Sequence, residues 1–166
     1  MTNSGEIISN NLSSNNINNS KNIFVNGNLK VANNLNNSGL IEGLELNTNS
    51  IENTGNIEVS GKYGIGMYAS GLGSKAVNRG HIKLIGARSI GMYLDQHATG
   101  ENYGTIEATV DAIGSIGAVA MNGAIFKNYG QIKLLPAAGS IGTYSGKGGI
   151  TEDNATSGSQ TGTVEA

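Results

Sequence analysis

The chain has 166 residues, a formal net charge of −2, 26 glycines, one proline, and no cysteine or tryptophan. The lack of cysteine excludes a disulfide framework and thiolate metal sites, and the charge leaves no basic footprint for binding nucleic acid. Charged residues make up 13% of the chain, about half the usual share, which favours a backbone stacked on itself over a helical globule. The sequence has no apolar run of about 18 residues, so we expect no membrane-spanning helix.

One phrase, Asn-x-Gly-x-Ile with small variations, recurs along the whole chain. Its copies begin at Asn3, Asn19, Asn37, Asn53, Asn78, Asn102 and Asn128. Subtracting successive numbers gives steps of 16, 18, 16, 25, 24 and 26 residues. In the second copy Lys21 takes the place of the glycine. A repeat of roughly 20–50 residues is typical of solenoids, in which each unit buries its apolar face on its neighbours.

Residues 1–52 are rich in asparagine, and composition alone allows a disordered polar tract. Their apolar residues nevertheless recur in short alternating pairs, such as Leu29/Val31 and Leu44/Leu46. An aperiodic polar tract would not space apolar residues in this way. We therefore expect narrow β-solenoid coils of 16–18 residues in this part of the chain.

Residues 53–152 carry a second phrase whose isoleucines, Ile65, Ile90, Ile116 and Ile141, lie 25, 26 and 25 residues apart. Both phrases open segments that alternate apolar and polar residues, which indicates half-buried strands. Three such segments per period of about 25 residues predict one coil of an all-β, single-stranded parallel β-helix. Parallel crossovers favour right-handed winding. Residues 153–166 are expected to form an imperfect coil or a loop tail.

Equivalent residues of stacked coils lie directly above one another, so columns can be predicted. At the turns we expect an asparagine column, Asn53, Asn78, Asn102 and Asn128, and a glycine column, Gly55, Gly80, Gly104 and Gly130. Asparagine suits tight turns and can bond its own copy above and below, whereas glycine lets the backbone bend without a Cβ.

Two isoleucine columns are expected to point inward and supply most of the stability. They are Ile57, Ile82, Ile106 and Ile132, and Ile65, Ile90, Ile116 and Ile141. The outward column beside the first reads Glu58, Lys83, Glu107 and Lys133. Its alternating signs favour a single register, because a slip of one coil would bring like charges together.

The phrases Ser89-Ile90-Gly91-Met92-Tyr93 and Ala76-Val77-Asn78-Arg79-Gly80-His81-Ile82 resemble passenger-domain repeats of type V autotransporter adhesins. The resemblance covers residues 53–144 well and residues 1–52 loosely. It implies a right-handed β-helical stalk that a C-terminal barrel carries past the outer membrane of a Gram-negative bacterium. It also implies display at the cell surface or release from it, and a host or bacterial surface protein or glycan as partner. The chain itself is expected to be monomeric and not to insert into a membrane.

The sequence contains no recognisable catalytic constellation. The two histidines lack metal-type spacing. We expect both to be solvated, because His81 occupies a variable polar surface position of the repeat and His97 lies in the loop Asp95-Gln96-His97. Asp95 and Asp111 are the candidates for paired glycosidase acids, although turns also favour aspartate for structural reasons. The start of the chain lacks a cationic and apolar leader, so leader and barrel are expected elsewhere in a longer parent protein. We expect no enzyme activity, cofactor or metal; a polysaccharide-active β-helix enzyme and a phage tail-spike or fibre segment remain as alternatives.

Aligned tyrosines are the one feature that predicts recognition. Tyr68, Tyr93 and Tyr144 share a column that Val119 interrupts, and Tyr103 and Tyr129 share another. If the first column faces outward, its rings can stack on sugars as a ligand surface. The alternative is that they shield the coil backbone and pack on one another.

Overall fold

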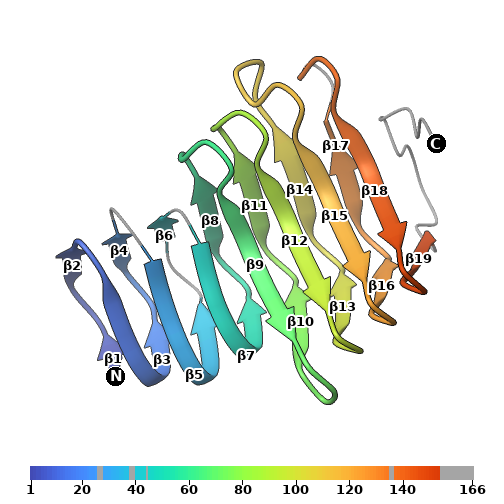
Figure 1. Cartoon of the computed structure of the whole chain (residues 1–166). Helices are drawn as coiled ribbons and strands as arrows, with labels where there is room; N and C mark the ends of the chain where they lie inside the picture. The colour runs from blue at the N-terminus through green and yellow to red at the C-terminus, as the bar shows by residue number, and fades with distance from the viewer. Residues whose placement is uncertain (26–27, 38–39, 44, 135–136, 154–166) are drawn as a thin grey trace.

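A computed structural model describes residues 1–25, 28–37, 40–43, 45–134 and 137–153, with side chains described for 1–24, 40, 51–134 and 137–152. Within these ranges the chain is all β, and its parallel strands stack as the coils of a β-solenoid (Figure 1). No helix of the described ranges is long and apolar enough to cross a membrane. The expected β-helix is therefore confirmed. The part of the expected tail from residue 154 onward lies outside the described residues.

The first coils contain two strands each. Their strands are β1 (Thr2–Asn3), β2 (Glu6–Ser9), β3 (Leu12–Asn19), β4 (Asn22–Val25), β5 (Asn28–Asn37), β6 (Leu40–Gly43) and β7 (Glu45–Asn53). Residues 1–52, which composition alone could assign to a disordered tract, thus contribute strands that pair in parallel register with later coils.

The later coils contain three strands each. Their strands are β8 (Asn56–Val59), β9 (Ile65–Ser70), β10 (Lys75–Asn78), β11 (His81–Leu84), β12 (Ile90–Asp95), β13 (Thr99–Asn102), β14 (Thr105–Ala108), β15 (Ile116–Met121), β16 (Ile125–Asn128), β17 (Gln131–Lys133), β18 (Ile141–Gly146) and β19 (Ile150–Asp153).

The coil widens because one long strand becomes two. The N-terminal half of β7 pairs with β9, and its C-terminal half pairs with β10. Between β9 and β10 the chain adds a turn held by Gly71 and Gly73, with φ of 99° and 84°. The next coil turns at Gln96 and His97, with φ of 49° and 66°. One residue separates β6 from β7, whereas five separate β8 from β9. This longer turn and the added turn between β9 and β10 together account for the increase in repeat length near residue 53.

The strands form two sheets that run along the solenoid. The larger has the order β18-β15-β12-β9-β7-β10-β13-β16-β19, with β5, β3 and β1 continuing from β7. The smaller has the order β17-β14-β11-β8-β6-β4-β2. Because the larger sheet divides at β7, each wide coil has three walls: one from β8 and its equivalents, one from β9 and one from β10.

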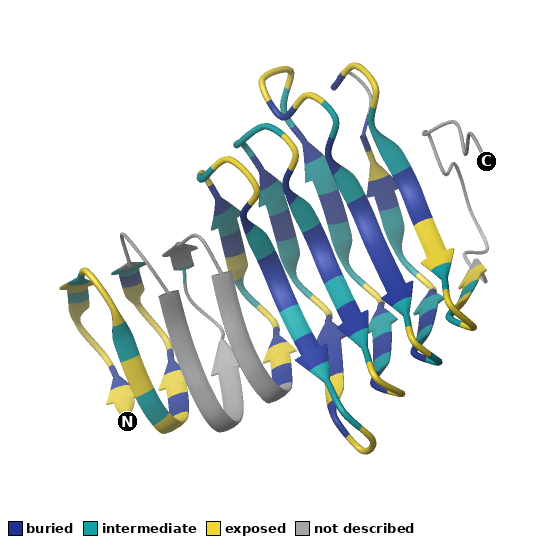
Figure 2. Cartoon of the chain, viewed as in Figure 1, coloured by how far each residue is buried: buried dark blue, intermediate teal, exposed yellow. Residues whose placement is uncertain are grey.

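The first isoleucine column lies in the interior, as predicted. Ile57, Ile82, Ile106 and Ile132 are 2%, 0%, 0% and 1% exposed, and the wall that carries them alternates between buried and more exposed residues (Figure 2). Burying an isoleucine contributes about 1.5–3 kcal/mol. This column is therefore a main source of stability.

The prediction for the second isoleucine column was wrong. Ile65, Ile90, Ile116 and Ile141 are in register but only half-buried, and the inward positions belong to the two residues that follow each of them. The first of these is always glycine, and the second is methionine after Ile65 and Ile90, Ala118 after Ile116 and Thr143 after Ile141. A Cβ at Gly66 would lie 2.6 Å from the carbonyl oxygen of Gly91 and 2.9 Å from Cγ2 of Ile82. The interior beside the first isoleucine column therefore has room only for glycine, and the neighbouring isoleucine points outward.

The interior keeps its volume by exchanging large and small residues between walls. Leu94 is fully buried opposite Gly100, where an added Cβ would collide with the leucine side chain. In the next coil Ala120 takes the leucine position and Phe126, fully buried, takes the glycine position. The large side chain that fills the interior thus comes from the β12 wall in one coil and from the β16 wall in the next, which keeps the interior close-packed.

The asparagines lie one above another and form a buried amide ladder. Nδ2 of Asn53, Asn78 and Asn102 each donates to Oδ1 of the next asparagine, Asn78, Asn102 and Asn128, at 2.8 Å in every step. Asn3 donates to Asn19 in the same way at 2.7 Å. Burying an amide is costly unless it is bonded, so the ladder fixes each coil above the one before it.

Glycine follows in the adjacent column because the backbones approach too closely for a side chain. A Cβ at Gly104 would collide with the carbonyl oxygen of Gly80, and the same clash recurs between Gly130 and Gly104. In the second narrow coil Lys21 occupies this place, and its backbone carbonyl accepts a bond from Nδ2 of Asn19 at 2.8 Å.

We predict that Ile106→Asp prevents folding at ordinary temperatures, because it buries an unpaired carboxylate in the interior. The matched change Ile116→Asp, at a half-buried outward position, should lower the melting temperature by a smaller amount. Thermal melting followed by circular dichroism measures both. Equal losses from the two substitutions would contradict the assignment of the columns.

We predict that Asn102→Ala lowers the melting temperature by several degrees. It removes the bond that Asn78 donates to Asn102 and the bond that Asn128 accepts from Asn102, and the loss of a partner by a buried polar group costs about 1–3 kcal/mol. Gln131→Ala, at a half-buried position on the neighbouring strand, is the control and should change the midpoint little. A midpoint for Asn102→Ala that matches the control would argue against the ladder.

Candidate functional surface

The predicted ligand surface lies on the wall formed by β9, β12, β15 and β18. Tyr68 and Tyr93 are half-buried and stack with ring centroids 5.6 Å apart and planes inclined by 25°. Val119 follows in register and is 4% exposed, and Tyr144 comes next at 46%. Tyr68 and Tyr93 therefore stack on each other, so one face of each ring is not available to a ligand. This agrees with the alternative expectation that these tyrosines pack on one another.

The burial of Val119 excludes an open slot between its tyrosine neighbours. A small side chain at the floor of an empty gap would be solvent-exposed, but this one is almost completely covered. Burial, with a smaller contribution from the negative charge of Asp95, raises the pKa of Tyr93. Its hydroxyl therefore stays protonated at neutral pH, and the wall remains uncharged around it.

A second aromatic surface lies at the turn that follows the asparagine ladder. Tyr103 and Tyr129 are 43% and 40% exposed and stack almost parallel, with centroids 4.9 Å apart and planes inclined by 10°. The guanidinium of Arg79 lies 4.6 Å from the centre of the Tyr103 ring. Each of these residues stands directly after its ladder asparagine, so their side chains form one stripe across three coils.

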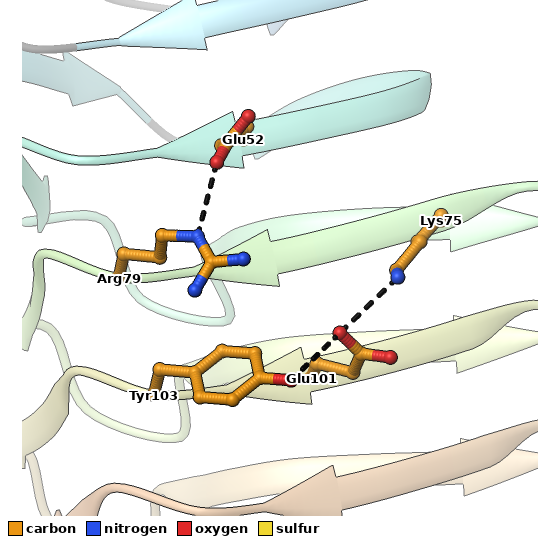
Figure 3. A network of polar contacts seen from close by, with 5 residues as sticks. All are labelled: Glu52, Lys75, Arg79, Glu101 and Tyr103. Carbon is orange, nitrogen blue, oxygen red and sulfur yellow. Dashed lines mark hydrogen bonds and ion pairs between the residues drawn. The ribbon is translucent and has the colours of Figure 1, made fainter.

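Charged groups tie the stripe to the wall beside it, as Figure 3 shows. Nε of Arg79 donates to Oε1 of Glu52 at 3.1 Å. The hydroxyl of Tyr103 donates to Oε2 of Glu101 at 3.3 Å, and Nζ of Lys75 lies 3.1 Å from the same oxygen. Partial burial and the charge of Glu101 raise the pKa of Tyr103, so its hydroxyl remains a donor at neutral pH. We call these five residues, together with Tyr129, the Arg–Tyr stripe.

The stripe presents hydroxyls and charges more than open ring faces. Arg79 covers one side of the Tyr103 ring and Tyr129 covers the other. What remains toward solvent is ring edge, hydroxyl and guanidinium, a mixture suited to hydrogen bonding with a protein or a glycan. The sequence signal for the tyrosine pair was their shared position between Asn and Gly, whereas Arg79 at the same position gave no sign that it joins them.

A third aromatic contact lies at the turns that precede β9 and β12. Nη1 of Arg88 donates to the hydroxyl of Tyr63 at 3.1 Å, and both residues have positive φ, of 57° and 63°. The hydrogen bond and charge of Arg88 lower the pKa of Tyr63. Tyr63 is 58% exposed, so this contact orders a surface turn without forming a pocket.

The candidate catalytic acids do not meet. Asp95 ends β12, whereas Asp111 lies in the turn before β15, the parallel neighbour of β12. Their separation spans the length of a six-residue strand, roughly 20 Å at the rise of a β-strand, against the 5–10 Å that paired acids require. Oδ1 of Asp95 instead accepts from Nδ2 of Asn122 at 2.6 Å and from the backbone N–H of Gln96 at 2.9 Å.

The histidines also lie apart from any cluster. His97 is exposed in its turn, as expected. His81 departs from that expectation, because it is half-buried with Nε2 3.2 Å from Oε1 of Glu107, a contact that attracts when the imidazole is protonated and lacks hydrogen-bond geometry. Among the described residues, no three His, Cys, Asp or Glu side chains gather in a group that could hold a metal ion.

A model of the BigA third pectate lyase-like domain matches residues 1–105, more than half of the chain. The chain belongs to this family. Neither a search of curated proteins nor one of solved structures found a match. The matched part of this BigA-type chain contains the narrow coils and the first two wide coils, together with Tyr68, Tyr93 and most of the Arg–Tyr stripe.

We predict that Arg88→Gln raises the pKa of Tyr63 toward its ordinary value of about 10. The folded-state pKa is lower than the unfolded one, so this contact adds stability above the unfolded pKa, and that contribution is lost as pH falls through the folded pKa. NMR titration of the Tyr63 ring carbons measures the shift. Arg79→Gln is the control, and a Tyr63 pKa that responds equally to both variants would contradict the pairing.

Proposed function

We propose that the chain is a structural and adhesive segment of a bacterial surface protein, with no catalytic chemistry of its own. The single observation that carries this proposal is the match to a BigA domain over residues 1–105, joined to a solenoid of stacked coils. A regular solenoid is an extended rod, and rods of this kind present long binding surfaces. Display through the autotransporter route of a Gram-negative bacterium, as a stalk attached to host or neighbouring cells, is part of the proposal.

The distribution of charged groups supports a binding role. Three described carboxylates pair with a lysine or arginine of a neighbouring coil: Glu52 with Arg79, Glu101 with Lys75 and Glu152 with Lys127. Such exposed pairs stabilise by at most about 1 kcal/mol, but they orient the side chains along the rod. Acids used in this way orient the surface side chains, and the candidate catalytic pair, Asp95 and Asp111, lies a strand length apart.

We assign the attachment surface first to the Arg–Tyr stripe. It combines exposed tyrosine edges and hydroxyls with a guanidinium already fixed by Glu52, and fixed aromatic and arginine side chains are the usual centres of binding energy. The column of Tyr68, Tyr93 and Tyr144 is the weaker candidate for a glycan, because two of its rings stack on each other and Val119 is covered.

A polysaccharide-active β-helix enzyme is the second candidate, favoured by the words "pectate lyase-like" in the family description. Elimination from an acidic polysaccharide needs a base beside the sugar and stabilisation of the carboxylate, supplied by acids around a cation together with a basic residue. Incubation of the chain with a panel of acidic polysaccharides tests this reading. The appearance of unsaturated products would overturn the non-catalytic assignment.

We predict that Tyr103→Ala combined with Tyr129→Ala reduces attachment of chain-coated beads to cells or glycan arrays at least about tenfold, since each lost aromatic contact is worth 1 kcal/mol or more. Tyr63→Ala, which removes an exposed tyrosine from another surface, is the control and should leave attachment unchanged. Equal attachment by all three proteins, with the wild-type fold retained, would reject the stripe as the binding surface.

A further inference from the structure

One wall of the wide coils is almost free of charge on its outer side. The outward positions of β9, β12, β15 and β18 are Ile65, Tyr68, Ser70, Ile90, Tyr93, Asp95, Ile116, Val119, Met121, Ile141, Tyr144 and Gly146. We call this set the uncharged wall. Its single formal charge at neutral pH, Asp95, lies at the end of a strand and is bonded to Asn122.

The other two walls are solvated in the ordinary way. Between β8 and β17 the outward column alternates Glu58, Lys83, Glu107 and Lys133. Between β10 and β19 the outward side chains include Lys75, Glu101, Lys127 and Glu152, which form ion pairs. A continuous wall of isoleucine, tyrosine, valine and methionine beside two charged walls indicates an interaction surface.

The half-burial of this wall comes from its own ladders. Ile90 and Ile116 each have an isoleucine of the coil above and of the coil below as register partners, and Tyr68 lies against Tyr93. Figure 2 shows these strands mostly as buried and intermediate, with exposed residues on β18. The outer surface is therefore flat and closely packed, and it repeats at the spacing of the coils.

We propose that the uncharged wall is an interface for a second copy of this chain. Two copies share the same axial repeat of about 4.8 Å, so ladders of isoleucine and tyrosine on one copy keep step with those on the other along the whole contact. This is the interdigitation that allows identical ladders to pack without water between them. The side chains of a partner with a different axial spacing would fall out of register with these ladders within a few coils.

The charges that border the wall permit this pairing. Arg88 precedes β12 and Asp95 ends it, so they lie at opposite edges of the wall. A two-fold axis parallel to the solenoid turns the Arg88 edge of each copy toward the Asp95 edge of the other, which brings opposite charges together. In the same arrangement Lys62 faces the uncharged turn at residues 71–73 of the second copy, and Asp111 faces the turn at residues 122–123.

The area of the wall predicts a weak association. Four strands spaced by about 4.8 Å and six residues long, with a rise of about 3.3 Å per residue, cover about 400 Å² on each copy. The total of about 800 Å² is below the roughly 1,200 Å² of stable complexes. The dilute chain should thus be monomeric and pair only when concentrated, as molecules crowded on a surface are.

Sedimentation velocity of the full chain over a wide range of concentration tests the proposal. We expect a reversible monomer–dimer equilibrium, weakened at least about tenfold by Tyr93→Lys, because the substitution brings like charges together across the contact. Tyr144→Lys, at a 46% exposed position, should weaken it as well and places less demand on folding. Thr105→Lys puts the same charge on the wall of β14 and is the matched control.

Each outcome decides the question. A chain that stays monomeric at every concentration overturns the proposal, as does association that both tyrosine variants leave intact or that the control weakens equally. Circular dichroism of each variant establishes that the solenoid is retained. The measurement uses purified chain alone, so a failure to pair is separate from a failure of the proposed attachment, which cells or glycans report.

Discussion

Axial register between coils is the constraint on which the rest of this structure depends. The backbone turns sharply at every ladder asparagine, and the side-chain amides at these turns are buried away from water. Each amide therefore needs a hydrogen-bond partner within the protein. Asn78 meets this demand by accepting a bond from Asn53 and donating one to Asn102. The cost of breaking such a bond exceeds its net contribution to stability, so the ladder specifies alignment more than it adds energy. The isoleucines beside it then contribute the hydrophobic stabilisation.

Much of the fold was predictable because every coil of a solenoid needs the same strands and turns, so the same residue types recur at a fixed period. The period located the turns, and the alternation at Ile82, Lys83 and Leu84 located a strand and its buried side. The outward direction of Ile65 was not predictable from period-two alternation alone. Gly66 and Met67 both face inward, which breaks the alternation. The structure shows why position 66 must be glycine: a side chain there would collide with Gly91 and Ile82.

Contacts between walls were also beyond the sequence pattern. Leu94 and Phe126 fill the interior of successive coils from different walls. The small residues opposite them, Gly100 and Ala120, can be explained only when the three-dimensional contacts between the walls are known. The Arg–Tyr stripe is similar, because Arg79 and Tyr103 share a position in the repeat but differ in chemistry. The repeat pattern joined only Tyr103 with Tyr129, and the structure showed the guanidinium of Arg79 lying over the Tyr103 ring.

The rod separates its tasks among its surfaces. The interior and the amide ladder hold the coils together, lysine and arginine ion pairs cross from coil to coil along the wall that contains β10, and aromatic residues gather on two separate surfaces. This separation leaves outward positions free to vary, because an outward substitution does not touch the bonds that define the coil. Recognition can therefore differ among members of the family while the scaffold stays the same.

The uniform direction of the ladder has a consequence for how such proteins lengthen. In each described step from Asn53 to Asn128 the amide nitrogen donates toward the C-terminal neighbour, so every rung offers the same donor on one side and the same acceptor on the other. A gene duplication that inserts one complete turn of the spiral would meet matching partners at both of its junctions. The length of the rod can thus change by whole coils during evolution, with no new contacts needed where the inserted coil meets its neighbours.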